Sequence, residues 1–255
     1  MRAAIAQMRV VAGDVKQNLS RAEELLSTTD AELVLLPELF TTGFEYTHLR
    51  SLAKPLEVHA EALRGLAEGR ALAGSVPELS GGRLYNTFLL LRDGEILGSY
   101  RKIHLFGREK EHFSAGREVG VAELEGMKLG MSICYDLRFP ELYRALTFLG
   151  AELMLVCAEF PAPRQEHFRV LARARAIENL CYVLACNCTG RDAENRYAGG
   201  SLAVSPWGEV LAEAGEDEEV LEVRVERSEV ERIRHKFPAL RDARPAELLQ
   251  MCGRG

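Results

Sequence analysis

Residues 127–160, MKLGMSICYDLRFPELYRALTFLGAELMLVCAEF, carry the pattern that decides the fold class of this chain. An apolar run ending in GMSIC predicts a buried strand, and AELMLVCAEF predicts a second one. Between them, Pro140 stands where the first turn of a helix is expected, and Gly150 stands where that helix ends. A strand, a helix and a further strand in this order indicate an α/β protein.

The same alternation continues on both sides of this stretch. Asp14 is placed to cap a helix, and Asp93-Gly94 and Glu125-Gly126 predict the tight turns of β-hairpins. Strands are expected within 2–11, 31–39, 71–79, 84–102, 121–136, 151–160, 180–188 and 199–215, and helices within 15–26, 56–69, 140–150 and 164–179, before a short strand and helix in 215–236. Because hairpins are mixed with helices and no low-complexity linker divides the chain, the pattern indicates one layered α/β domain with a mixed sheet.

Two segments far apart in the chain resemble one another. AELVLLPELF (31–40) and AELMLVCAEF (151–160) each follow an expected helix and share the frame Ala-Glu-Leu-x-Leu. The similarity predicts two related half-units arranged about a pseudo-twofold axis. Coincidence between two buried strands is the alternative interpretation.

The composition excludes several classes of protein. The 255 residues include 38 acidic and 32 basic side chains, for a net charge of −6, whereas a dedicated nucleic-acid binder would show a basic face. No apolar run approaches the length of a membrane span, and MRAAIAQMRV lacks the apolar core of a signal peptide. We therefore expect a soluble cytoplasmic protein with no nucleic-acid or membrane partner.

Motifs that hold phosphates, dinucleotides or zinc are missing from the sequence. There is no GxxxxGK[ST], no GxGxxG after a strand and no HExxH. Cys186 and Cys188 lack the two-residue spacing of a zinc knuckle. We expect neither a metal nor a cofactor.

One of the six cysteines has a distinctive setting. Cys134 ends an apolar strand directly before a polar turn and a helix, which is how a nucleophile elbow exposes its reactive residue. A nearby helix N-terminus would also favour the thiolate. The alternative is a buried thiol that closes a strand, the role expected for most of the others, which are Cys157, Cys181, Cys186, Cys188 and Cys252.

A cysteine nucleophile needs a base and a group that stabilises the oxyanion. Glu38 in LVLLPELF follows an expected buried strand, and a carboxylate with apolar neighbours accepts a proton more readily than one in water. Lys102 in SYRKIHLF falls where another strand leaves the sheet. An exposed glutamate at a strand end and an ordinary surface lysine are the alternatives.

PELF around Glu38, YRKIHLF around Lys102 and GMSICYDLRFPELYR around Cys134 resemble the three signatures of the nitrilase superfamily, the carbon–nitrogen hydrolases. Their order and their separations of 64 and 32 residues also match. The resemblance covers essentially the whole chain. It implies a four-layer αββα sandwich that forms a single carbon–nitrogen hydrolase domain over residues 1–255.

The resemblance also implies a role for each matching residue. Glu38 would be the general base, and Cys134 would form a thioester acyl-enzyme. Lys102, with the backbone N–H of Tyr135, would hold the oxyanion. The second glutamate of the family is assigned to Glu111, although Glu109 lies only two residues away.

Within the superfamily, CYDLRFPEL and HLF most resemble the omega-amidase branch, which implies a small linear amide as substrate. Arg138 is expected either to pair with Asp136 or to bind a substrate carboxylate, with the ion pair favoured. Glu159 and Phe160 are expected to line the pocket, although an acid there would disfavour an anionic substrate. An N-carbamoyl amino acid hydrolase, a nitrilase and a non-catalytic scaffold are the alternatives.

The helix expected over 164–179 has an arginine-rich face opposite its apolar positions. By the resemblance, this surface would form a homodimer. A solvated helix face is the alternative.

Overall fold

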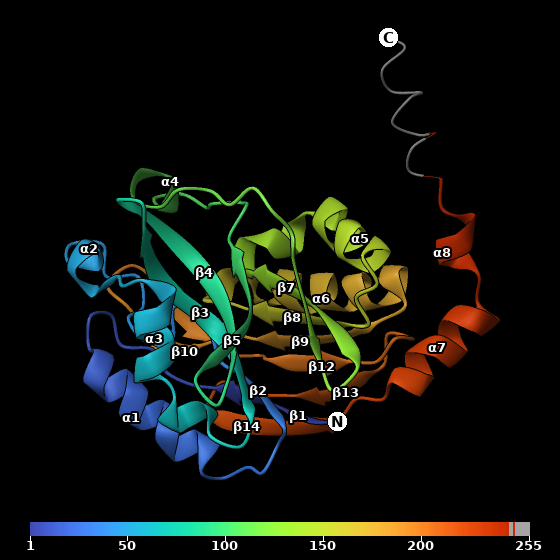
Figure 1. Ribbon diagram of the computed structural model, residues 1–255, viewed down its shortest axis with the longest axis horizontal. Helices are drawn as coiled ribbons and strands as arrows, with labels where there is room; N and C mark the ends of the chain where they lie inside the picture. Colours follow the sequence, from blue (N-terminus) through green and yellow to red (C-terminus); the bar gives the residue numbers. More distant parts are fainter. Residues whose placement is uncertain (245–246, 248–255) are drawn as a thin grey trace.

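The computed structural model describes residues 1–244 and residue 247, which form two six-stranded sheets and a small hairpin (Figure 1). The first sheet has the order β14-β1-β2-β3-β4-β5 and the second has the order β13-β12-β9-β8-β7-β6. The strands are β1 (Arg2–Gln7), β2 (Leu33–Leu35), β3 (Ala71–Ser80), β4 (Arg83–Arg92), β5 (Glu95–Arg101), β6 (Gly120–Leu124), β7 (Met127–Ile133), β8 (Leu153–Cys157), β9 (Tyr182–Cys186), β10 (Thr189–Arg191), β11 (Arg196–Ala198), β12 (Leu202–Val204), β13 (Val210–Glu213) and β14 (Glu219–Arg224).

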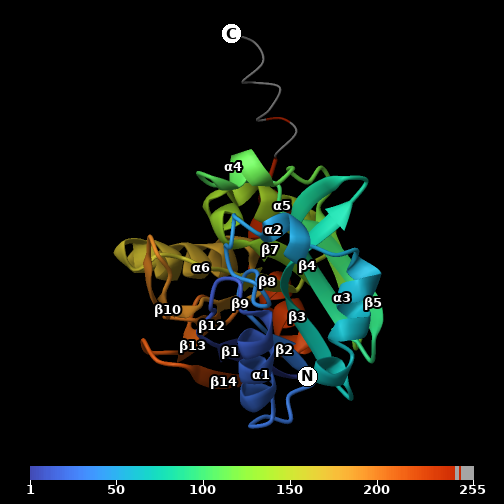
Figure 2. The same ribbon diagram turned by 90° about the vertical axis from the view of Figure 1, so that its left-hand side faces the viewer.

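Helices cover the outer face of each sheet. The α-helices are α1 (Val15–Leu26), α2 (Leu49–Leu52), α3 (Leu56–Ala62), α4 (Glu109–His112), α5 (Pro140–Phe148), α6 (Gln165–Asn179), α7 (Arg227–Lys236) and α8 (Ala239–Asp242), and the 3₁₀ helices are η1 (Gly65–Ala67), η2 (Cys134–Arg138) and η3 (Ala162–Arg164). Helices α1 and α3 lie on the first sheet, and α5 and α6 lie on the second (Figures 1 and 2). The four layers are therefore helix, sheet, sheet and helix, as predicted.

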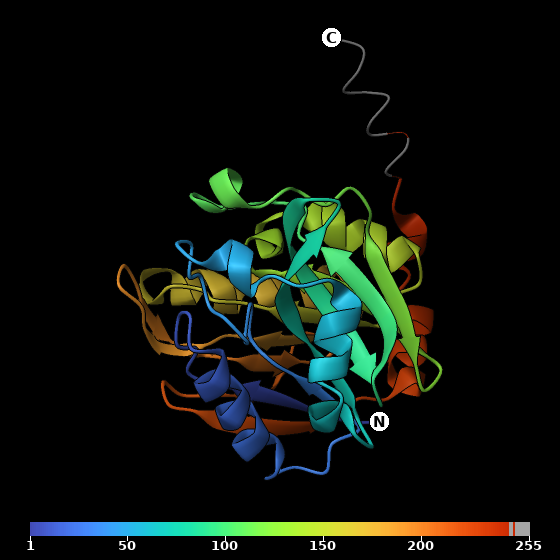
Figure 3. The ribbon, with the colours of Figure 1, turned by 60° about the vertical axis from the view of Figure 1, so that its left-hand side comes forward.

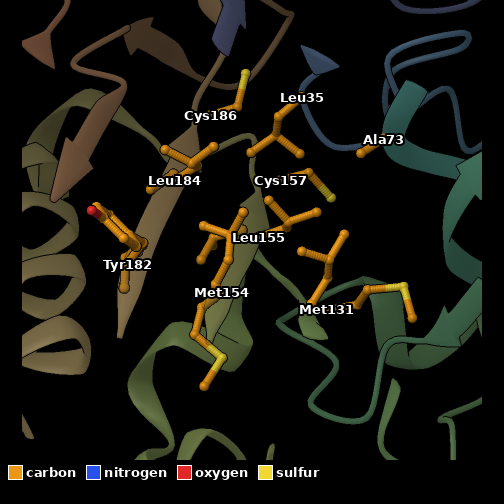
Figure 4. Close-up of a cluster of buried hydrophobic side chains, with 14 of the residues drawn as sticks. Leu35, Ala73, Met131, Met154, Leu155, Cys157, Tyr182, Leu184 and Cys186 are labelled. Atoms are coloured by element: carbon orange, nitrogen blue, oxygen red, sulfur yellow. The ribbon is translucent and has the colours of Figure 1, made fainter. Parts of the chain in front are cut away.

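Successive residues of the strands face different layers, as strand geometry requires. In β1, Ala3 and Ile5 belong to the core between the sheets, whereas Ala4 and Ala6 face the helices. Figure 4 shows Leu35 and Ala73 of the first sheet on one side of the inner core and Leu155 of the second sheet opposite them. Burial on both faces explains why these strands are continuous apolar runs.

The two half-units predicted from the repeated sequence are present. Strand β2, within 31–40, pairs in parallel with β1 and β3. Strand β8, within 151–160, pairs in parallel with β7 and β9. Each repeated segment thus forms the middle strand of a parallel trio, flanked in its own sheet by antiparallel strands.

Local signals in the sequence are also confirmed. The side chain of Asp14 accepts a hydrogen bond from the backbone N–H of Gln17 at the start of α1. Pro140 is the first residue of α5, and Gly150 adopts a positive φ of 98° just beyond its end. Asp93-Gly94 and Glu125-Gly126 form their turns with positive φ at both residues of each pair.

Several expected strands are shorter than predicted. Strand β2 ends at Leu35 instead of residue 39, and β8 ends at Cys157 instead of residue 160. In both cases the apolar run continues into a buried loop, so hydrophobicity alone does not mark the end of the strand. The helix expected over 56–69 divides into α3 and η1. Cys252 lies outside the described residues.

Glycine residues allow a close approach of the two sheets at β5 and β6. A Cβ atom on Gly120 of β6 would lie 2.4 Å from Cβ of Tyr100 in β5, and one on Gly98 would lie 2.7 Å from Cβ of Ala122. These distances are shorter than any real contact between side-chain carbons. The edge strands β5 and β6 therefore pack so closely that there is no space between them for another methyl group.

We expect Gly120→Ala to lower the free energy of unfolding by about 1–3 kcal/mol, the usual cost of overpacking a core. The measurement is urea denaturation, with Gly215→Ala as the control because a Cβ there meets no atom within 4 Å. Equal stabilities of the two variants would show that the sheets do not approach this closely.

Candidate active site

Three strand ends and the short helix α4 supply the charged centre of the site. Glu38 follows β2, Lys102 follows β5 and Cys134 follows β7. The Lys102 ammonium lies 2.7 Å from Glu38 Oε1 and 2.7 Å from Glu109 Oε1. The side chains of Lys102 and Glu38 are fully buried. The structure therefore brings together the three residues predicted from the sequence and adds Glu109.

Each oxygen of the Glu38 carboxylate has a fixed donor. Oε1 accepts hydrogen bonds from Lys102 Nζ and from Asn86 Nδ2, which lies 2.7 Å away, and Oε2 accepts one from the backbone N–H of Glu159 at 3.0 Å. The next residue, Leu39, has a positive φ of 41°, and its N–H donates to Ser75 Oγ. The chain thus turns sharply at Glu38 and holds its carboxylate in one orientation.

Cys134 occupies the strained turn that the sequence predicts. It is the first residue of η2 and has a φ of 47°, which is rare for a residue with a side chain. Asp136 braces this turn, since its carboxylate accepts hydrogen bonds from the N–H of Ile133 at 3.0 Å and from the Tyr100 hydroxyl at 2.8 Å. Such strain is typical of residues held in place for a function.

The surroundings of Cys134 oppose the thiolate that a nearby helix N-terminus was expected to favour. Burial and the Glu38 carboxylate raise the pKa of the Cys134 thiol well above its usual range, and the Lys102 ammonium offsets this only in part. The thiol therefore keeps its proton at neutral pH. A base within reach is needed to remove this proton, and Glu38 is the carboxylate that acts most strongly on the thiol.

The second glutamate that contacts Lys102 is Glu109. The prediction that Glu111 would occupy this position is therefore wrong. Glu109 begins α4 and is 4% exposed, whereas Glu111 is exposed on the same helix. Two residues apart on a helix, these side chains point to different sides. In Figure 3, α4 is the green helix at the top of the view, and α2 is the light-blue helix below it.

The charges of this cluster depend on one another. Burial works against the Lys102 ammonium, but the carboxylates of Glu38 and Glu109 overcome it and raise the pKa of Lys102 well above its usual range. Burial, opposed by Lys102, raises the pKa of Glu109 to about 7. Lys102 is thus always charged, while Glu109 changes its charge near neutral pH.

Asp136 and Arg138 do not form the expected ion pair. The Asp136 carboxylate is already occupied, since it also contacts His104 Nδ1 at 2.7 Å. Arg138 points the other way, with its Nη2 atom 3.2 Å from His167 Nδ1 and its guanidinium carbon 5.5 Å from the centre of the Phe160 ring. Arg138 is therefore free of carboxylate partners among the described residues.

A cavity of about 700 Å³ opens onto the cluster. Glu38, Glu109 and Cys134 form part of its wall, and the predicted pocket residues Tyr135, Glu159 and Phe160 also line it. The remaining lining residues are Ala12, Phe44, Glu45, Tyr46, Thr47, Phe106, Gly107, Arg108, Arg138, Pro161, Arg164, Asp192, Ala193, Glu194, Asn195 and Tyr197.

Several of these residues were not recognised in the sequence. Asp192, Glu194 and Tyr197 come from the β10–β11 hairpin, where no motif marks them. Arg108 joins this hairpin to the segment before α4 through an ion pair with Glu194, at 2.6 Å. Asn86 in β4 carried no signal either, because only the fold places it beside Glu38.

Among the residues that the structure describes, no group of His, Cys, Asp or Glu side chains could hold a metal ion. Within the same residues, no helix is long and apolar enough to cross a membrane.

The sequence matches the family described as "Carbon-nitrogen hydrolase" over residues 2–235. It is 39% identical over 247 residues to a 2-oxoglutaramate amidase of Bacillus subtilis (strain 168), covering 93% of this chain and 95% of that relative. It is 35% identical over 252 residues to a deaminated glutathione amidase of Synechocystis sp., covering 89% and 92%.

Solved structures show the same similarity. XC1258 from Xanthomonas campestris, described as a CN-hydrolase superfamily protein, is 31% identical with a TM-score of 0.90 and coverage of 96% of this chain and 97% of that one. A mutant of the amidase from Nesterenkonia sp. AN1 has 31% identity, a TM-score of 0.85 and coverage of 98% and 96%. That structure shows covalent addition of the acetamide moiety of fluoroacetamide at the active site cysteine.

A family match over nearly the whole described chain, amidase relatives and the shared fold lead to one conclusion. The chain belongs to the carbon–nitrogen hydrolase family of the nitrilase superfamily and is an enzyme that hydrolyses amides.

Proposed function

We propose that this enzyme hydrolyses a small linear amide through a thioester on Cys134, with Glu38 as base and Lys102 as the cation that stabilises the oxyanion. The observation that carries the proposal is the buried Lys102 ammonium between two carboxylates, beside a protonated thiol in the wall of a cavity. A base, a nucleophile and a fixed positive charge are the three parts that acyl transfer requires.

In the first half of the reaction, Glu38 takes the proton of the Cys134 thiol as sulfur bonds to the amide carbon. The oxyanion that forms accepts hydrogen bonds from Lys102 Nζ and from the backbone N–H of Tyr135. Collapse of this intermediate breaks the C–N bond, and Glu38 returns its proton to the leaving nitrogen, which departs as ammonia. The acyl group remains on sulfur as a thioester.

In the second half, Glu38 removes a proton from a water molecule as that water attacks the thioester carbon. The same two donors hold the second oxyanion. Breaking the C–S bond releases the carboxylic acid, and Glu38 returns its proton to sulfur. Both halves need one base that faces the sulfur, and the three hydrogen bonds to Glu38 keep its carboxylate there.

Glu109 has the role of positioning Lys102. It shares the ammonium with Glu38, and its other oxygen Oε2 accepts a hydrogen bond from the N–H of Phe106 at 3.3 Å. The Lys102 side chain is therefore held from two directions.

The cavity favours an acyl group that ends in a carboxylate. Arg138 and Arg164 line it, and neither forms an ion pair with a described residue. Two guanidinium groups without carboxylate partners attract an anion. We therefore propose a monoamide of a short dicarboxylic acid, in agreement with the name of the 39% identical relative, a 2-oxoglutaramate amidase.

We further propose a homodimer and a cytoplasmic location. The outer face of α6 and the neighbouring turn expose Val170, Ile177 and Trp207, each at least half exposed. An apolar patch of this kind is typical of a subunit interface. Five cysteines are free and buried in the described part of the chain, which fits a reducing compartment.

We expect the protein to release ammonia from glutaric acid monoamide and 2-oxoglutaramate, and Cys134→Ala to reduce this release by at least about 10⁴-fold because no other group forms the thioester. The same assay is run with a nitrile and an N-carbamoyl amino acid, the substrates of the two alternative enzymes. Cys181→Ala, which changes a buried thiol outside the cavity, is the control and should retain activity. Turnover of amides by Cys134→Ala at the parent rate would disprove the mechanism.

We expect Glu109→Gln to change how stability depends on pH. The pKa of Glu109 is raised from 4.5 to about 7 in the folded protein. Between pH 4.5 and pH 7 the folded state therefore keeps a proton on Glu109 that the unfolded state has already released. The free energy of unfolding of the parent therefore falls by up to roughly 3 kcal/mol as the pH rises through this range. Glu109→Gln has no group that titrates at this position and lacks this loss.

The measurement is urea denaturation from pH 4.5 to 8, with Glu111→Gln on the exposed side of α4 as the control. The control should follow the parent. Parallel curves for the parent and Glu109→Gln would show that Glu109 does not titrate in this range.

We expect Arg138→Met to lower kcat/KM for glutaric acid monoamide by about 10–100-fold, the effect of losing a charged hydrogen bond, and to leave pentanamide within about 3-fold. Pentanamide has the same carbon chain without the carboxylate. Arg173→Met is the control, since Arg173 bonds the Gly208 carbonyl and does not line the cavity. Equal losses on both amides would assign Arg138 a structural role.

A further inference from the structure

Glu159 is a buried carboxyl group that the mechanism above does not use. It is 6% exposed and lines the cavity beside Cys134. Its backbone already serves the site, because its N–H donates to Glu38 Oε2 and its carbonyl oxygen lies 3.8 Å from Cys134 Sγ. The main chain alone makes these contacts, so they do not explain why the side chain is an acid.

The Glu159 side chain has an oxygen without a partner. Oε1 is buried and accepts no hydrogen bond from the described residues. The nearby Tyr197 hydroxyl donates its only proton to Asp192 Oδ2, at 2.7 Å. An unpaired buried polar atom costs free energy, so its presence in the wall of a substrate cavity indicates that substrate supplies the missing partner.

The surroundings of Glu159 oppose a negative charge. Burial, together with the nearby carboxylates of Glu38 and Asp192, raises the pKa of Glu159 well above its usual range, and Tyr197 and Lys102 offset this only in part. The cations nearby have other partners, since Lys102 is held by Glu38 and Glu109, and Arg108 pairs with Glu194. These surroundings favour the protonated, neutral form of the Glu159 carboxyl group, and a neutral carboxylic acid has a proton to donate.

We propose that Glu159 is a specificity-determining residue that donates a hydrogen bond from its neutral carboxyl group to an acceptor oxygen, oxo or carboxylate, on the acyl part of the substrate. This inference rests on the proposed function and names a contact that Arg138 and Arg164 do not supply. It also removes the conflict between an acid in the pocket and an anionic substrate. A neutral acid attracts an oxygen acceptor where a carboxylate would repel it.

The proposal separates two properties of the side chain, its donor and its charge. Glu159→Gln is neutral, keeps the shape and retains an N–H donor. Glu159→Met fills similar space without a donor, and Glu159→Ala removes the group with less risk of overpacking. Each variant is assayed on pentanamide, glutaric acid monoamide and 2-oxoglutaramate, with thermal unfolding measured alongside.

We expect Glu159→Met and Glu159→Ala to lower kcat/KM by about 10–100-fold for one or both of the oxygen-bearing amides and to stay within about 3-fold of the parent on pentanamide. Glu159→Gln should stay within about 5-fold on all three substrates. This pattern would establish a neutral donor that recognises the acyl group.

Two results would overturn the proposal. If Glu159→Met and Glu159→Ala lose the same factor on all three amides, the side chain supports the active site and recognises nothing. If Glu159→Gln loses as much as they do on the oxygen-bearing amides, the ionised carboxylate is the working form. Failure of the parent enzyme to hydrolyse any amide would instead disprove the proposed function.

Discussion

The buried ammonium of Lys102 is the interaction on which the rest of the site depends. A charge with no exposure to water is tolerated only when it is paired, and Lys102 has two carboxylates at 2.7 Å. Removing either carboxylate leaves part of that charge uncompensated. The positions of Glu38 and Glu109, and through them β2 and α4, are therefore fixed by the same cation that is proposed to stabilise the oxyanion.

The backbone is strained where it places these groups in the site. Leu39 and Cys134 both adopt positive φ directly at the charged cluster, a conformation that is unfavourable for residues with side chains. Ser75 holds the first turn and Asp136 holds the second. Because Ser75 lies in one sheet and Cys134 follows a strand of the other, the site forms only when the two sheets have packed together.

The sequence was sufficient for features that local chemistry determines. The turn at Cys134, the helix starting at Pro140 and the position of Glu38 after a buried strand each follow from neighbouring residues. The choice between Glu109 and Glu111 does not follow from neighbouring residues. It depends on which side of the one-turn helix α4 faces Lys102. The partners of Asp136 were likewise missed, since Tyr100 and His104 reach it only through the packing of the two sheets.

The number of acids around the cavity is consistent with an anionic substrate once their protonation is considered. Glu38 is balanced by Lys102, and Asp192 accepts hydrogen bonds from Tyr197 and from the N–H of Asn195. Burial favours the neutral form of Glu159, and the raised pKa of about 7 leaves Glu109 fully charged only above that pH. Of the six acids that line the cavity, Glu159 and, below pH 7, Glu109 therefore do not cancel the field of Arg138 and Arg164. The desolvation that makes such acids costly to bury is also what removes their charge, and it leaves the cavity with more positive potential than its composition indicates.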